Sequence, residues 1–286
     1  MAKAKILLQL DTDSRPSVFD AVVAVDAGVE HLLQYGGVAP QHVRNLVYGT
    51  IFTRGIDDLQ NTAIFIGGSD VNDGEALLRE VQQTFIGPMR VSVMLDSNGA
   101  NTTAAATVLA AARHVPLAES RALVLASTGP VGSRVVNLLA TAGTIVRVAS
   151  RSMERAEGLC RIVSARIPQA RLEPVATESV AMSAVLAGVQ VVISAGAPGV
   201  EVLSESARRA CESLRVAIDL SAVPPSGIGG VEATDNARDR DGCICYGALG
   251  VGGLKMKIHK AAIRQLFTAR NHVLDVEQIS AIAREL

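Results

Sequence analysis

The first third of the chain alternates short apolar runs with longer segments in which apolar residues recur every three or four positions. Short apolar runs are typical of buried strands, and a period near 3.6 residues is typical of a helix with one buried face. The predicted strands are Ile6–Leu10, Ala63–Ile66 and Val91–Leu95. The predicted helices are Val18–Val25, Glu75–Phe85 and Thr102–Arg113. This alternation predicts an α/β domain over residues 1–115.

A second series of apolar runs begins after a polar break at Pro116, where we place a domain boundary. Five buried strands are predicted, at Leu123–Ala126, Val146–Ala149, Leu172–Val175, Val191–Ser194 and Val216–Leu220. They start roughly twenty residues apart, which is the spacing that a βαβ crossover needs. The pattern predicts a Rossmann-type doubly wound parallel sheet over residues 116–261, with a cleft between the two domains. Two helical patterns, Leu254–Phe267 and Val276–Leu286, end the chain. We expect residues from about 262 to 286 to pack on the N-terminal domain.

Composition narrows the classes of function. The chain has 286 residues, of which 49% are hydrophobic and 19% are charged, so it is expected to fold into a globular protein. Its 27 basic and 28 acidic residues give a net charge of −1, and only 3% of its residues are aromatic. This balance excludes nucleic acid and membrane surfaces as expected partners. The N-terminal residues lack the long apolar region of a signal peptide, which predicts a cytoplasmic protein.

The segment ALVLASTGPVG, residues 122–132, passes from a predicted strand through a turn into a helix start. A nucleotide pyrophosphate binds such a turn, because glycine permits close approach and the first helical amides donate hydrogen bonds. Against the pattern G-x-G-x-x-G, Ser127 replaces the first glycine. The predicted cofactor-binding residues are Thr128, Gly129, Pro130, Val131 and Gly132. The alternative is that these glycines serve only the packing of a strand against a helix.

The end of the next predicted strand indicates which dinucleotide binds. A site for NAD usually has an acidic residue there, whereas this chain has Ser150, Arg151 and Ser152. Hydroxyls and a guanidinium suit the 2′-phosphate of NADP, although Arg can also stack on adenine and admit NAD. A solvated Arg151 at a helix start is the alternative. Small residues after the fourth strand, Ala195 and Gly196, suit a backbone that lies against the ribose and nicotinamide.

Three further segments carry candidate substrate-binding residues. The polar run after the strand Val91–Leu95 supplies Asp96, Asn98, Asn101 and Thr102, although helix capping alone explains one of them. Asp20 stands in a polar turn after the first strand, and Lys255 follows the glycine-rich run that starts at Gly247. None of the five histidines has the spacing of a metal site, so no metal is predicted.

Seven segments together resemble the bacterial NAD(P)-dependent methylene-tetrahydromethanopterin dehydrogenases and their methylene-tetrahydrofolate relatives. They are Phe19–Asp20, Thr62–Gly68, Met94–Gly99, Asn101–Ala106, Thr128–Gly132, Pro224–Gly230 and Gly247–Lys255. The resemblance implies an enzyme that oxidises the methylene bridge of a reduced pterin to the methenyl form in one-carbon metabolism, with hydride passing to NADP or NAD. It also implies that Lys255 and the N-terminal half face the pterin, and that the chain forms a homo-oligomer, a trimer or hexamer.

The implied reaction needs no general base, because two nitrogen lone pairs stabilise the cation that hydride loss leaves behind. A charged Lys255 would oppose that cation, so we expect this residue to bind the pterin carbonyl or to be neutral through burial. Asp20 and Asp96 are expected to offset the charge or bind pterin N–H groups, with capping as the alternative. Two other functions stay open: a methylene-tetrahydrofolate dehydrogenase and a non-catalytic NADP-binding sensor.

Overall fold

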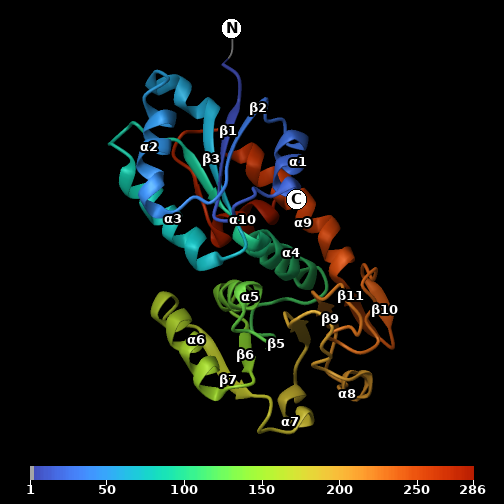
Figure 1. Cartoon of the computed structure of the whole chain (residues 1–286). Coiled ribbons are helices and arrows are strands. Elements are labelled where there is room, and N and C mark those ends of the chain that lie inside the picture. Colours follow the sequence, from blue (N-terminus) through green and yellow to red (C-terminus); the bar gives the residue numbers. More distant parts are fainter. Residues whose placement is uncertain (1–2) are drawn as a thin grey trace. The chain divides into compact units, whose positions relative to one another are not determined.

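The computed structural model describes residues 3–286 and divides into two compact units (Figure 1). Unit 1 comprises Met1–Thr102 and Met256–Leu286, and unit 2 comprises Thr103–Lys255. These limits fall inside two helices, α4 (Ala100–Ala112) and α9 (Ala248–Gln265), whereas the sequence placed them at residues 115/116 and 261/262. A continuous helix shows no polar break where its packing partners change, and the pattern of the sequence therefore has no signal at these points.

Unit 1 contains a five-stranded sheet in the order β12-β4-β3-β1-β2, and all its strands are parallel. The strands are β1 (Ile6–Asp11), β2 (His31–Tyr35), β3 (Thr62–Gly67), β4 (Ser92–Leu95) and β12 (Val273–Leu274). Strand β12 comes from the C-terminal segment and pairs Val273 with Val93, so that segment returns to the N-terminal sheet. The sequence analysis missed β2, because this edge strand is mostly exposed and lacks a buried apolar run.

Helices cover the unit 1 sheet on both faces. Ile64 and Ile66 of β3 join a core with residues of α2 (Pro40–Ile51) and α3 (Val71–Thr84). Phe65, between them in sequence, points to the opposite face and stacks on His259 of α9. This alternation follows from the two-residue period of a strand. The remaining helices of the unit are α1 (Val18–Asp26) and α10 (Val276–Ala283), with the short 3-10 helices η1 (Ile56–Asn61) and η2 (Ser97–Gly99).

Unit 2 contains a seven-stranded sheet in the order β10-β11-β9-β8-β5-β6-β7. Its strands are β5 (Arg121–Leu125), β6 (Ile145–Ser150), β7 (Arg171–Ala176), β8 (Val191–Ser194), β9 (Val216–Asp219), β10 (Arg238–Arg240) and β11 (Cys243–Tyr246). Every strand pair is parallel except β10 with β11. Its helices, besides parts of α4 and α9, are α5 (Pro130–Thr141), α6 (Met153–Arg166), α7 (Met182–Leu186) and α8 (Glu205–Arg209).

The predicted α/β fold with a doubly wound Rossmann-type sheet is confirmed. The five strands predicted after Pro116 correspond to β5 to β9, each within about two residues at either end. Strands β10 and β11 were missed. Strand β10 is short, charged and largely exposed, and β11 is a run of only 4 residues. Helix α9 starts at Ala248 rather than at Leu254, since the glycines in its first turns are poor helix formers and hid its beginning.

Candidate functional site

The strand order of unit 2 reverses between β5 and β8. Strands β6 and β7 follow β5 on one side, whereas β8 and β9 lie on its other side. Ligands of open parallel sheets bind at the carboxyl ends of the strands where such a reversal occurs. The loop after β5 and the residues after β8 stand at this point, so the topology brings together two segments that the sequence analysis singled out.

The loop after β5 keeps a dinucleotide-binding shape without its first glycine. Ser127 is buried, and its hydroxyl donates a 2.9 Å hydrogen bond to the carbonyl of Ala149 at the end of β6. In this loop Ala126, and not Ser127, has a left-handed backbone conformation, with φ of 53°. A Cβ on Gly132 would lie 2.8 Å from the Cα of Ser127, so the start of α5 needs glycine to pack against the loop. The serine therefore replaces a glycine at a position where no positive φ is needed.

The first turn of α5 offers donors to an anion. Gly129 is the N-cap residue with an extended backbone, and Pro130 occupies the first turn, where its missing N–H costs little. The amides at the start of a helix have no partners within that helix and carry partial positive charge. Thr128, Gly129 and Val131 are half-buried at this turn and Pro130 is exposed. These residues fit the pyrophosphate of a dinucleotide.

The end of β6 fits a second phosphate. Ser152 is the N-cap of α6, and its hydroxyl accepts a hydrogen bond from the amide of Arg155 at 3.5 Å. The hydroxyl of Ser150 accepts from the amide of Ser152 at 3.4 Å, and Arg151 between them is exposed. The two serines thus shape the turn, while the guanidinium of Arg151 stands at a helix start with its charge in solvent.

The chain after β8 lies against the loop between β5 and α5, residues 126–129, which we call the phosphate loop. The amide of Ala195 donates to the carbonyl of Leu125 at 3.1 Å. A Cβ on Gly196 would lie 3.9 Å from the Cβ of Ala126. Both predicted residues, Ala195 and Gly196, are half-buried beside the loop that carries Thr128 and Gly129. The ten residues predicted to bind the cofactor therefore follow three neighbouring strands, β6, β5 and β8, at their carboxyl ends.

The strand order of unit 1 reverses between β1 and β3. At the carboxyl end of β1, the buried carboxylate of Asp11 accepts hydrogen bonds of 3.0 Å from the amides of Asp13 and Ser17. Gly67 ends β3, and a Cβ there would lie 3.1 Å from Asp11 Oδ2 and 3.6 Å from Asp20 Oδ2. Two carboxylates therefore face one glycine at the reversal. Asp20, a predicted substrate residue, lies in the first turn of α1 and not in a turn before it. Asp11 was not predicted, although its position at the end of a buried strand was the available signal.

Asp96 caps the start of α4. Its Oδ1 accepts hydrogen bonds from the amides of Asn101 at 2.9 Å and Thr102 at 3.0 Å, and its Oδ2 accepts one from the Thr102 hydroxyl at 2.6 Å. The Asn101 amide group donates to the carbonyl of Leu95 and to Asp275. These three predicted substrate residues are buried and hold one another, whereas Asn98 is exposed with φ of 56°.

His259 and two phenylalanines form an aromatic group that the sequence analysis did not single out. His259 is fully buried on α9, its ring centre lies 5.6 Å from that of Phe65 and 6.4 Å from that of Phe19, and Nδ1 lies 3.9 Å from Asp96 Oδ2. Lys255 is half-buried and precedes His259 by four residues, so both side chains lie on the same face of the helix. Periodicity places these residues on one helical face, but it does not identify their neighbours.

The glycine run before Lys255 has a packing role. A Cβ on Gly247 would lie 2.0 Å from the carbonyl oxygen of Glu232, and one on Gly250 would lie 1.9 Å from that of Asp235. The backbone of α9 therefore approaches the segment before β10 too closely for any side chain. Gly250, Gly252 and Gly253 lie inside α9 instead of leading into its start, which corrects the sequence-based interpretation of the run.

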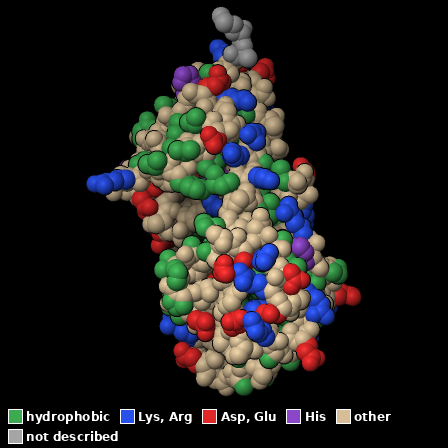
Figure 2. Space-filling model, turned by 90° about the vertical axis from the view of Figure 1, so that its right-hand side faces the viewer, with side chains coloured by type: hydrophobic (Ala, Val, Ile, Leu, Met, Phe, Trp, Pro, Cys, Tyr) green, Lys and Arg blue, Asp and Glu red, His purple; other side chains and the backbone are tan. Residues whose placement is uncertain are grey.

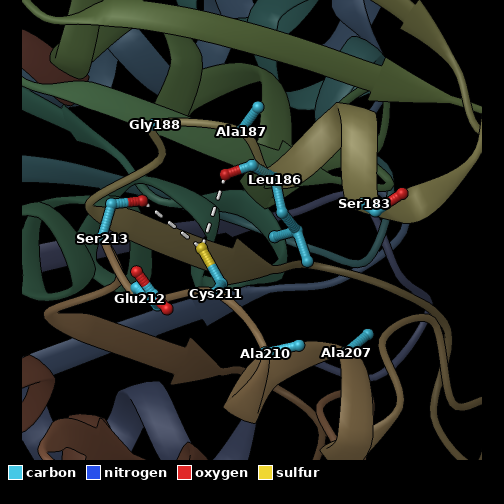
Figure 3. A pocket seen from close by; sticks show the side chains of 9 residues that line it. All are labelled: Ser183, Leu186, Ala187, Gly188, Ala207, Ala210, Cys211, Glu212 and Ser213. Atoms are coloured by element: carbon cyan, nitrogen blue, oxygen red, sulfur yellow. Dashed lines mark hydrogen bonds between the residues drawn. The ribbon is translucent and has the colours of Figure 1, made fainter.

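A separate cavity of about 400 Å³ lies at the other end of the unit 2 sheet (Figure 3). It is lined by α7, α8 and the residues just before β8 and β9, among them Leu186 and Cys211. The thiol of Cys211 contacts the carbonyl of Leu186 at 3.4 Å and the hydroxyl of Ser213 at 3.5 Å. The rest of the wall is formed by Glu212 and by the small residues Ser183, Ala187, Gly188, Ala207 and Ala210. The loop after β5 is at the opposite end of the strands.

Charge on the surface is mixed. In Figure 2, acidic and basic side chains alternate over the face of unit 2 that is shown. An anionic ligand must then be held by local donors such as a helix start. Among residues 3–286, no three His, Cys, Asp or Glu side chains are grouped as ligands for a metal ion. Within the same residues, no helix has the length and apolar character needed to cross a membrane.

Comparisons with known proteins find similar sequences. A family model described as methylene-tetrahydromethanopterin dehydrogenase, N-terminal, matches residues 18–98. The bifunctional protein MdtA of Methylorubrum extorquens is 42% identical over 284 residues, which is 99% of either chain. The NAD(P)-dependent methylenetetrahydromethanopterin dehydrogenase of the same organism is 30% identical over 98% of either chain.

A solved structure has a similar fold. Shikimate 5-dehydrogenase from Listeria monocytogenes, in complex with shikimate and NAD, superposes with a TM-score of 0.58 over 98% of this chain and 96% of that one. The identity is 13%, so the likeness concerns the fold alone.

Proposed function

The chain belongs to the methylene-tetrahydromethanopterin dehydrogenase family, and from this we propose that it transfers a hydride from 5,10-methylene-tetrahydromethanopterin to NADP or NAD. The product is the methenyl form of the carrier. The observation that carries the proposal is the phosphate loop at the β5–β8 reversal, in a chain that resembles an NAD(P)-dependent relative over its full length. The chain is accordingly an NAD(P)-dependent oxidoreductase.

We assign the dinucleotide to unit 2. The pyrophosphate binds the turn Thr128–Gly132 at the start of α5, where Val131 and Gly132 have helical amides to donate and Pro130 has none, and the 2′-phosphate of NADP binds Ser150, Arg151 and Ser152. Ala195 and Gly196 lie on the nicotinamide side. The bound dinucleotide supplies the hydride acceptor. Residues 116–261 were expected to form this domain, and every assigned residue lies within unit 2.

We assign the pterin to the carboxyl edge of the unit 1 sheet and to Lys255. Asp11 and Asp20 face Gly67 there, and Asn98 is exposed in the loop after β4. Asp96, Asn101 and Thr102 hold that loop rigid through their mutual hydrogen bonds. Their contribution to substrate binding is therefore support of the loop, whereas Asp20, Asn98 and Lys255 supply contacts.

The chemistry suits a site that positions its ligands. The C–H bond of the methylene bridge breaks, its electron pair leaves with the hydrogen, and a nitrogen lone pair forms the amidinium bond. No proton moves, so no general base is required. Holding the reacting groups in place can contribute about 7–11 kcal/mol to catalysis. In this proposal Lys255 donates a hydrogen bond to the pterin carbonyl and fixes the orientation of the ring.

Two predictions from the sequence stay predictions. The homo-oligomer, a trimer or hexamer, is implied by the family resemblance, and a location in the cytoplasm was expected from the N-terminal residues. Size measurement by light scattering tests the first, and fractionation of cells tests the second.

One assay tests the proposed function. Purified protein is mixed with methylene-tetrahydromethanopterin or methylene-tetrahydrofolate and with NADP or NAD, and the absorbance of reduced nicotinamide is followed. The proposal expects the highest kcat/KM for the methanopterin carrier with NADP. A higher kcat/KM for the folate carrier would favour the alternative dehydrogenase. Absence of turnover with all four pairs, in protein that binds NADP, would overturn the enzyme in favour of a sensor.

A further inference from the structure

A buried carboxylate lies at the carboxyl end of β9, two strands from the phosphate loop. Asp219 is 1% exposed, and its neighbour in the sheet is Ser194 at the end of β8. Its oxygens accept hydrogen bonds from the amides of Ser221 at 3.1 Å and Ile228 at 3.3 Å. The amide of Gly227 also donates to it, and the hydroxyl of Ser194 lies beside it, against the same glycine. The sequence analysis assigned no role to this residue.

The loop after β9 closes over this carboxylate. The chain leaves at Ser221 and returns at Gly227, where a Cβ would lie 2.5 Å from Ser194 Oγ and 2.8 Å from Asp219 Oδ1. Only glycine fits at this approach. The same loop accepts a hydrogen bond from the chain after β8, since the amide of Gly199 donates to the carbonyl of Val223. The carboxylate therefore holds both ends of the loop after β9, and this loop contacts the chain after β8.

The proposed orientation of the dinucleotide along the strand ends of unit 2 places its nicotinamide near Asp219. In the proposed function, on which this inference rests, the 2′-phosphate lies at β6 and the pyrophosphate at β5. The nicotinamide half must then continue across the reversal toward β8 and β9. Neighbouring strands lie about 4.8 Å apart, so the end of β9 is about 10 Å from that of β5. This is within the span of the nicotinamide half of the molecule.

Asp219 forms no ion pair with a basic side chain among the described residues, and the groups that donate to it are the backbone amides of Ser221, Ile228 and Gly227. Burial raises the pKa of Asp219 above its usual range, while these hydrogen bonds oppose the rise by stabilising the ionised form. In a buried environment, a fixed charge acts over several ångströms with little screening by solvent.

We infer that Asp219 makes the site prefer the oxidised dinucleotide to the reduced one. The oxidised nicotinamide ring carries a positive charge and the reduced ring is neutral, so a fixed negative charge nearby stabilises only the oxidised form. This preference suits an enzyme that consumes the oxidised cofactor and must release the reduced one. Asp219 acts on binding selectivity and takes no part in the transfer of the hydride.

The test compares dissociation constants for NADP⁺ and NADPH at pH 8, by calorimetry and by NADPH fluorescence. Asp219→Asn should raise the dissociation constant for NADP⁺ by a factor at least about five times larger than the factor for NADPH. Ser194→Ala, which removes the hydroxyl beside the carboxylate and keeps the charge, should change both constants by the same factor. Asp219→Ser provides a second charge-free variant if the Asn variant does not fold, because its hydroxyl can accept one of the loop amides.

The outcomes separate this inference from the function on which it rests. Equal changes in both dissociation constants in the charge-free variants, or none, would overturn the role of Asp219 while leaving the dehydrogenase intact. Wild-type protein that binds neither dinucleotide would overturn both.

Discussion

The hydroxyl of Thr102 donates a 2.6 Å hydrogen bond to the carboxylate of Asp96, six residues earlier in the chain. Both residues are buried, and the same carboxylate accepts two backbone amides at the start of α4. This relationship fixes the loop between β4 and α4, which contains the exposed Asn98. In the proposed function, Asp96 and Thr102 therefore support this loop, and Asn98 contacts the ligand.

Asp96→Ala should lower the free energy of unfolding by about 2–3 kcal/mol, because three buried donors lose their acceptor. Urea titration measures the change, and Asp57→Ala, at an exposed carboxylate of the same unit, should change it by less than about 0.5 kcal/mol. Well below the melting temperature, Asp96→Asn should leave the KM for the pterin within about threefold of wild type. A selective rise in KM without loss of stability would make Asp96 a substrate contact.

Arg151→Glu should reverse the choice of cofactor. A carboxylate at this exposed turn repels the 2′-phosphate and accepts hydrogen bonds from a free ribose, so the ratio of kcat/KM for NADP to that for NAD should fall at least about tenfold. Arg166→Glu makes the same charge change in the last turn of α6 and should leave the ratio unchanged. An unaltered ratio in the Arg151 variant would place the 2′-phosphate elsewhere.

Lys255→Met should reduce kcat/KM for the pterin at least about tenfold, or about 1.4 kcal/mol, because the ring loses a donor that orients it. The dissociation constant for NADP should stay near that of wild type. Lys257→Met is the matched control, since Lys257 is exposed on the same helix. Near wild-type turnover in the Lys255 variant would refute the positioning role.

The Asp235–Arg240 pair should make stability depend on pH. Burial raises the pKa of Asp235, but hydrogen bonds of 2.6 and 2.7 Å from Arg240 outweigh it, and the pKa is lower than usual. A carboxyl with a lowered pKa stabilises the fold above its unfolded value of about 3.9 and loses that contribution as the pH falls through the folded value. Asp235→Asn should lower the free energy of unfolding by about 2 kcal/mol at pH 7. The difference in this free energy between the variant and wild type should shrink below about pH 4. A loss of unfolding free energy that does not change with pH would show that the charge of Asp235 does not contribute to stability.

The sequence predicted most strands because buried parallel strands are nearly continuous apolar runs. It placed the turn between a strand and a helix correctly after β5, but it did not show why Ser127 is tolerated. Ser127 is tolerated because its hydroxyl donates a hydrogen bond to the carbonyl of Ala149, a residue far from it in the chain and on the neighbouring strand. His259 was missed for the same reason, since its neighbours Phe65 and Asp96 lie far from it in the chain. Local patterns identify elements and turns, whereas the pairing of distant residues requires the fold.

The most direct measurement follows the transferred hydrogen itself. Methylene-tetrahydromethanopterin carrying two deuterium atoms on the bridge is turned over with NADP, and the reduced cofactor is analysed by mass spectrometry and proton NMR. Direct transfer predicts one deuterium in every molecule of reduced cofactor, attached to C4 of the nicotinamide. Reduced cofactor without deuterium, or carrier that stays unoxidised while NADP is bound, would contradict the account.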